Sequence, residues 1–153
     1  CLEALKSILQ TRCMNVIREK EGGTYAVNVN QGVVYEPVAQ YSMIVEFQCD
    51  PLNAAKLKGI VYGELERLRQ QVPSRDELMM ALNSIRKKEG EARESNVYWQ
   101  EKLVLYYRTG LNQADVREFE EIVDKLTPED FLEFVREFWE NVDITDVVFK
   151  PKS

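Results

Sequence analysis

Arg18 and Tyr25 are the two residues of this sequence whose types and spacing best suit chemistry on a peptide. A guanidinium presents several fixed N–H donors and a phenol can donate one hydrogen bond, so together they can hold the carbonyl groups of a polypeptide backbone. Neither group has to titrate to do this. The sequence contains no histidine, which is the usual general base near neutral pH and the commonest metal ligand. We therefore expect this chain to assist catalysis that is located elsewhere.

The elements on either side of this pair are expected to hold it in place. Apolar residues in positions 2–20 recur at intervals of three and four, which predicts a helix with one buried face. Gly22 and Gly23 are expected to end that helix, and the alternation that begins at Tyr25 predicts a strand. A purely structural explanation also accounts for the spacing, because arginine stabilises helix C-termini and tyrosine favours strands.

A second strand is predicted from the alternation over residues 41–49, antiparallel to the first. The link between the strands, residues 31–39, contains Gly32 and Pro37 and is expected to be an exposed, mobile loop. Asp50 is the expected N-cap of a helix that has Pro51 in its first turn and ends near residue 71.

The remainder of the chain is predicted to be helical, with one strand at its end. Ser74 and Glu77 form an expected capping box for a helix that ends near residue 94. Two shorter helices are expected on either side of Gly110, Thr127-Pro128 caps another, and residues 144–150 are predicted to form a final strand. The fold class is therefore α+β, with helices on one face of an antiparallel or mixed sheet. Because three strands make a thin sheet with open edges, we expect further strands upstream of the first residue.

Composition limits the classes of function that the chain can serve. Its 153 residues, 44% of them hydrophobic, suffice for a single domain, and the net charge of -6 argues against a nucleic-acid partner. No apolar run is long enough for a membrane span, and no signal peptide is recognisable. We expect a soluble protein, periplasmic or cytoplasmic, whose compartment would be decided by sequence upstream. Since the chain begins with Cys1 inside a helical pattern, we interpret it as an N-terminally truncated piece of a longer polypeptide.

Other groups capable of chemistry have simpler explanations. Paired glutamates such as Glu89 and Glu91 suit a solvated helix face, and a zinc site at Glu64 and Glu66 is not expected without a pair of histidines. Three widely spaced cysteines match neither a disulfide framework nor a zinc knuckle. We therefore predict no metal site in this chain. Core packing is the favoured role of the aromatic stretch, with ligand or partner binding as the alternative: Tyr98, Trp99, Tyr106 and Tyr107.

Five segments in order along the chain resemble the non-catalytic second half of the insulinase-like zinc peptidases, the pitrilysin or M16 family: IREKEGGTYAV, YSMIVEFQCDP, PSRDEL, SNVYW and LTPEDF. The resemblance implies a partial LuxS/metallopeptidase-like domain, so that residues 1–153 are a C-terminal domain of such an enzyme. In that family two similar halves close around a peptide. The first half carries the zinc motif HxxEH, which is absent from this sequence, so zinc is expected in the N-terminal half of the parent enzyme.

The resemblance also gives the polar pair a role. The second half of the family supplies an arginine and a tyrosine that match Arg18 and Tyr25 in order and interval, and these would bind the substrate and polarise its scissile carbonyl. The implied partners are a peptide or small-protein substrate and the N-terminal half of the parent enzyme, or a separate partner subunit. Two alternatives stay open: a non-catalytic structural subunit of the same family, and an unrelated helical protein-interaction domain.

Overall fold

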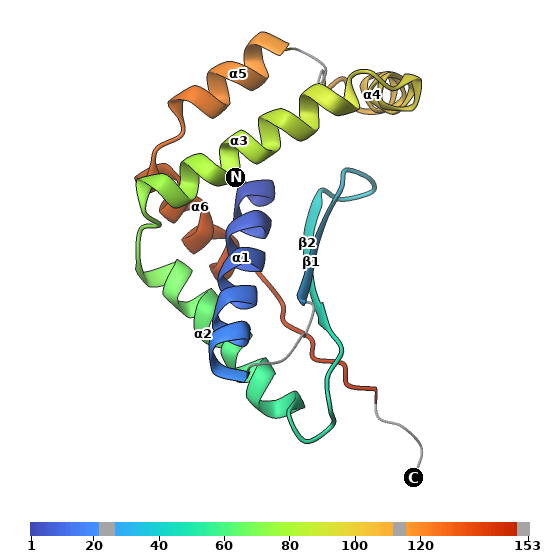
Figure 1. Cartoon of the computed structure of the whole chain (residues 1–153). Coiled ribbons are helices and arrows are strands. Elements are labelled where there is room, and N and C mark those ends of the chain that lie inside the picture. The colour runs from blue at the N-terminus through green and yellow to red at the C-terminus, as the bar shows by residue number, and fades with distance from the viewer. Residues whose placement is uncertain (22–26, 112–115, 150–153) are drawn as a thin grey trace.

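The molecule is a layer of helices with a two-stranded hairpin on one side of it (Figure 1). The computed structural model describes residues 1–21, 27–111 and 116–149, with the backbone alone for residues 18–21, 116 and 117. Along these residues the elements are α1 (Leu2–Glu21), β1 (Val27–Val34), β2 (Gln40–Phe47), α2 (Ala54–Gln70), α3 (Arg75–Ala92), α4 (Asn96–Thr109), α5 (Val116–Lys125) and α6 (Pro128–Glu140). This arrangement confirms the predicted α+β class.

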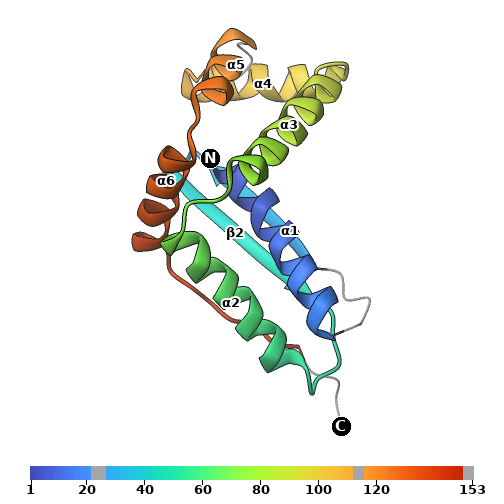
Figure 2. The same cartoon turned by 60° about the vertical axis from the view of Figure 1, so that its left-hand side comes forward.

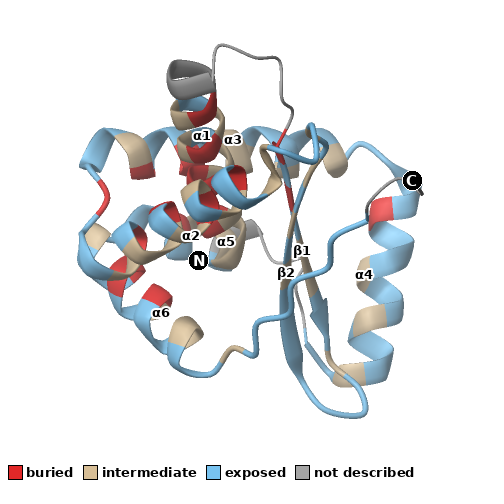
Figure 3. Cartoon of the chain, turned by 90° about the horizontal axis from the view of Figure 1, so that it is seen from below, coloured by how far each residue is buried: buried red, intermediate tan, exposed pale blue. Residues whose placement is uncertain are grey.

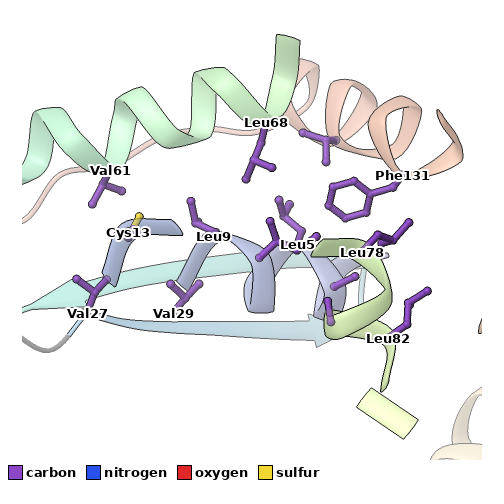
Figure 4. Packing of buried hydrophobic residues seen from close by; sticks show 14 of the residues in the cluster. Leu5, Leu9, Cys13, Val27, Val29, Val61, Leu68, Leu78, Leu82 and Phe131 are labelled. Atoms are coloured by element: carbon purple, nitrogen blue, oxygen red, sulfur yellow. The ribbon is translucent and has the colours of Figure 1, made fainter. Parts of the chain in front are cut away.

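Helix α1 is the centre of the core. Its apolar face packs between the hairpin on one side and α2 on the other, and the first turns of α3 cover its beginning (Figure 4). Leu9, Cys13 and Ile17 on this face are fully buried. Leu5 and Ile8 are buried too. The three- and four-residue spacing of the five side chains brings all of them to one side of a helix, whereas a strand would put Ile8 on the opposite face. The predicted helix over residues 2–20 is confirmed, ending one residue later.

The hairpin is antiparallel, and its register runs from Val27 opposite Phe47 to Val34 opposite Gln40. Val27 and Val29 are buried against α1, while Asn28 and Asn30, which alternate with them, are exposed. This alternation is the pattern of a sheet with one covered face. The first strand extends farther than expected, because residues 31–34 pair with β2. The predicted loop over residues 31–39 is therefore wrong in its first half, and only residues 35–39 connect the strands.

Side chains at the helix ends agree with the predictions in part. The Ser74 hydroxyl accepts a hydrogen bond from the backbone N–H of Glu77, as expected for an N-cap. Thr127 and Asp130 form a full capping box at the start of α6. Helix α2 begins at Ala54 instead of following Pro51 directly, because the Asp50 carboxylate accepts from the backbone N–H of Leu52 in a turn that precedes the helix.

The predicted final strand is wrong for the residues that the structure describes, 144–149. This segment is extended but belongs to no sheet, and Phe149 is 94% exposed. The Asp146 carboxylate instead accepts hydrogen bonds from Lys58 and Tyr62 of α2, both 3.0 Å long, which lower the pKa of Asp146. High strand propensity does not make a strand unless a neighbour supplies the ladder of hydrogen bonds.

Burial is concentrated where α1, α2, α6 and the start of α3 face one another, whereas α4 is almost entirely exposed (Figure 3). Helix α6 packs against α2. The buried apolar side chains of α6 therefore face another helix. Helices α4 and α5 lie at one end of the molecule, beyond the N-terminus of α1 (Figure 2).

Candidate functional site

Arg18 lies near the C-terminal end of α1, one turn before the helix ends at Glu21. The structure describes its backbone, and its side chain falls outside the described atoms. Tyr25 falls outside the described residues altogether. The predicted pairing of Arg18 with Tyr25 is therefore untested by the geometry and stays a prediction.

Described residues on either side of this pair are buried in the core. Cys13 and Ile17, which precede Arg18 on the same helix, are fully buried, and Val27, two residues after Tyr25, is 1% exposed. Helix α1 and strand β1 pack directly against each other. The chain is thus anchored in the core just before Arg18, and again two residues after Tyr25.

Sequence reasoning missed a strong ion pair between α3 and α1, the helix that carries Arg18. Arg12 of α1 donates from Nε and Nη2 to the two carboxylate oxygens of Glu77 on α3, at 2.5 and 2.7 Å. The predicted capping box assigned the Glu77 side chain to the start of its own helix, but the carboxylate turns to the guanidinium across the helix interface. These hydrogen bonds hold the pKa of Glu77 below its ordinary value. The pair fixes α1 against α3 and is structural in character.

Glu64 is a buried carboxylate at the contact of α2 with α1. It is 4% exposed, and the Arg67 guanidinium donates to its Oε1 at 2.7 Å. The charge of Glu64 adds to the effect of burial on Cys13, and together they raise the pKa of that thiol to about 12. A thiol that remains protonated is neither a nucleophile nor a metal ligand, so this neighbourhood is a packed interface instead of a reactive site.

No zinc site is evident where the structure describes the chain. Across residues 1–21, 27–111 and 116–149, no three side chains of the types His, Cys, Asp and Glu gather in a way that could hold a metal ion. That this chain holds no metal stays a prediction. Glu64, the carboxylate that was weighed as a ligand, is bound to Arg67.

The aromatic stretch on α4 divides into one buried residue and three exposed ones. Tyr98 is 9% exposed, and its hydroxyl donates to the carboxylate of Glu89, which also accepts from Arg93. Burial and this hydrogen bond raise the pKa of Tyr98 to about 12. Trp99, Tyr106 and Tyr107 remain exposed. The prediction that this stretch packs in the core is therefore wrong for those three residues.

A shallow polar cleft of about 390 Å³ lies between the ends of α2 and α6. It is lined by side chains of both charge signs: Glu66, Arg69, Gln70, Arg136 and Glu140. Arg136 donates to the backbone carbonyl of Arg69 at 3.3 Å, which satisfies a group left open at the helix end. The cleft lies at the C-terminal end of α2. The end of α1 that carries Arg18 lies near the other end of α2, where that helix begins (Figures 1 and 2). The cleft is therefore separate from the candidate site.

Comparison with known proteins gives one informative likeness. No protein-family model matches the chain. Over 121 residues it is 22% identical to a protein of Arabidopsis thaliana named "Zinc protease PQQL-like". The aligned region covers 76% of this chain and 13% of that protein, so the chain spans only a small part of the relative's length.

This likeness supports relatedness to the zinc proteases of the M16 type and goes no further. It is in keeping with the resemblance carried by the five sequence segments. The assignment to the C-terminal half, and the roles of Arg18 and Tyr25, stay predictions. No helix in the described part of the chain combines the length and the apolar character needed to cross a bilayer.

Proposed function

We propose that this chain is part of the C-terminal, substrate-binding half of a zinc-dependent endopeptidase. It would form one wall of the peptide chamber and be inactive alone. The observation that carries the proposal is the ordered set of segments from IREKEGGTYAV to LTPEDF, in a chain whose sequence is also similar to a zinc-protease-like protein.

The role of Arg18 and Tyr25 in this proposal is to bind and polarise. The Arg18 guanidinium would donate to backbone carbonyl groups of the peptide and orient it. The Tyr25 hydroxyl would donate to the oxygen of the scissile carbonyl as negative charge develops on it. A donor placed in advance at that oxygen stabilises the transition state more than the ground state. Both residues are next to segments anchored in the core, because Ile17 and Val27 are buried.

The zinc ion that activates water would belong to the N-terminal half of the enzyme. This chain has no histidine with which to bind it, and the described residues do not assemble an alternative ligand set. The contribution of the chain would therefore be separable from the metal site, since it would hold the peptide and donate hydrogen bonds without holding the ion.

The test is substitution in the polypeptide that contains this chain together with its catalytic half. Tyr25→Phe should lower kcat by about 10² to 10³ with little change in KM, as expected for the loss of one transition-state donor. Arg18→Ala should raise KM as well, because it removes contacts to bound substrate. The matched control is Tyr41→Phe, which removes the hydroxyl of an exposed tyrosine on β2 and should leave both constants unchanged.

Unchanged kcat/KM in both Tyr25→Phe and Arg18→Ala would reject this assignment. That result would favour the second candidate function, a non-catalytic structural or partner subunit of the same family. That candidate also agrees with the absence of histidine from the sequence, which both candidates share. An HxxEH motif in the preceding half of the polypeptide, or in a separately encoded partner, would argue for the peptidase.

A further inference from the structure

Helix α4 has two opposite faces of different character. The side turned toward the rest of the molecule contains Tyr98, Lys102, Leu105 and Thr109, all buried or partly buried. The other side, which we term the α4 face, consists of Val97, Gln100, Leu103, Val104 and Tyr107. Its four apolar residues are between 50% and 82% exposed. A solvent-facing side of a helix is normally polar, so this face is unusual.

The spacing of the α4 face is suited to another helix. Positions 97, 100, 104 and 107 are separated by three and four residues, which places them in a single row along the helix. Such a row is the seam that two packed helices share. By contrast, the exposed side of α3 near its end carries charged side chains such as Lys87 and Glu91. The row, which is apolar except for Gln100, thus does not extend along the end of α3.

Two charged residues flank the row, and their order along α4 limits which partner can pack on it. Glu101 and Arg108 are exposed, carry opposite charges and lie two turns apart along the same flank of the face. The Arg108 guanidinium donates to Glu36 in the hairpin loop. Because a guanidinium has five N–H groups, this bond leaves donors for a second carboxylate.

The geometry points to a second copy of this chain as the partner, with its α4 packed antiparallel on the α4 face. The midpoint between Glu101 and Arg108 falls beside Val104, in the C-terminal half of the row. A twofold axis at that point sets Glu101 of each copy near Arg108 of the other and brings the two Val104 side chains together. Parallel packing would instead place like charges opposite each other, which is unfavourable. A twofold contact is self-complementary and closes as a dimer.

The contact is expected to be weak. A helix of 14 residues spans roughly 21 Å, and a pair of such helices buries less surface than a stable standard interface. We therefore expect a reversible dimer that dissociates on dilution.

The proposal is independent of the peptidase assignment, since it concerns a different surface and does not involve Arg18 or Tyr25.

Sedimentation velocity of the 153-residue chain, from roughly 1 µM to 1 mM, tests the association. The sedimentation coefficient should rise with concentration from that of a monomer toward that of a dimer. Val104→Glu should raise the dissociation constant by at least about tenfold, because it places two carboxylates together at the axis. Glu91→Arg on α3, an equally exposed site outside the face, is the control and should behave as the parent chain.

Charge exchange distinguishes self-pairing from other effects on the same helix. Glu101→Arg alone and Arg108→Glu alone should each weaken the dimer, since each creates a like-charge contact across the axis. The chain that carries both substitutions should regain dimerisation, because the opposite charges again face each other. A chain that stays monomeric throughout the concentration range would overturn the proposal. So would a double variant that associates no better than the single ones.

Discussion

The core region and the α4–α5 arm of this molecule are held together by different interactions. The core region consists of α1, the hairpin, α2, the start of α3, and α6. The arm consists of the end of α3 together with α4 and α5. In the core region Leu9, Cys13 and Phe131 are fully buried. Helices α4 and α5 bury only Tyr98 and Val123 among the residues whose side chains are described.

Polar contacts supplement the small apolar burial of the arm, in which Val123 joins the core cluster. Arg93 binds the Glu89 carboxylate and lies within about 6 Å of the ring centroids of Tyr98 and Phe119. Arg86 of α3 reaches Glu120 on α5. These pairs are partly buried, and ion pairs near a surface contribute less each than fully buried apolar side chains, which contribute kilocalories. The core region therefore carries most of the stability of the fold, whereas the arm exposes the α4 face to solvent.

Phe131→Ala should produce the largest loss of stability and is the strongest test of this division. Phe131 is 0% exposed and lies where α6 meets the core. Truncation should lower the free energy of unfolding by about 3 to 5 kcal/mol, from lost apolar burial and the cavity left behind. Tyr107→Ala in the arm, at an 82% exposed position, should change it by less than about 0.5 kcal/mol. Urea unfolding measures both, and equal losses would break the comparison.

The Arg12–Glu77 pair should give the next largest effect, and one that depends on pH. Glu77→Gln should cost about 1.5 to 3 kcal/mol at neutral pH, as for a hydrogen-bonded charged group. The folded pKa of Glu77 is lowered, so the stabilisation is complete above the ordinary glutamate value of about 4.3. It is lost as the pH falls through the lower folded pKa.

Urea unfolding between pH 7 and pH 3 gives the free energy of unfolding of the parent chain and of Glu77→Gln. The quantity to compare is the difference between the two at each pH. The difference should shrink toward acid pH. Glu91→Gln on α3, whose carboxylate is exposed and 3.8 Å from Lys87, serves as the control and should show no comparable trend. A difference that is constant with pH would mean that the pair contributes nothing through charge.

Sequence patterns predicted the core region well because local signals and packing agree there. The apolar row of α1, the Ser74 cap and the capping box at Thr127 are all set by residues within a few positions of one another. The helix that carries Arg18 could thus be predicted from sequence. Tyr25 lies outside the described residues, so that half of the candidate site stays a prediction.

Failures occurred where the outcome depends on what a segment meets in space. Residues 144–149 have the composition of a strand, yet Asp146 is held by α2 and no ladder forms. Periodicity shows that α4 has an apolar face but not whether anything covers it, and so Tyr107 was wrongly placed in the core. The partner of Glu77 is 65 residues distant in sequence, and no local pattern indicates such a pair.

Tyr98→Phe should have the smallest effect, and its location sharpens the comparison most. It removes the hydroxyl that donates to Glu89, which should cost about 1 kcal/mol, and the loss should be confined to the arm.

The chain has two tryptophans. Trp99 lies beside Tyr98, with ring centroids 5.3 Å apart, and Trp139 lies on α6 in the core region. In Trp139→Phe, fluorescence reports the arm, and in Trp99→Phe it reports the core region. If the regions unfold separately, Tyr98→Phe lowers the urea midpoint of the Trp99 signal and leaves that of Trp139 in place. Equal shifts in both signals would show that polar contacts couple the arm to the core as one cooperative unit, despite the small area that α4 and α5 bury.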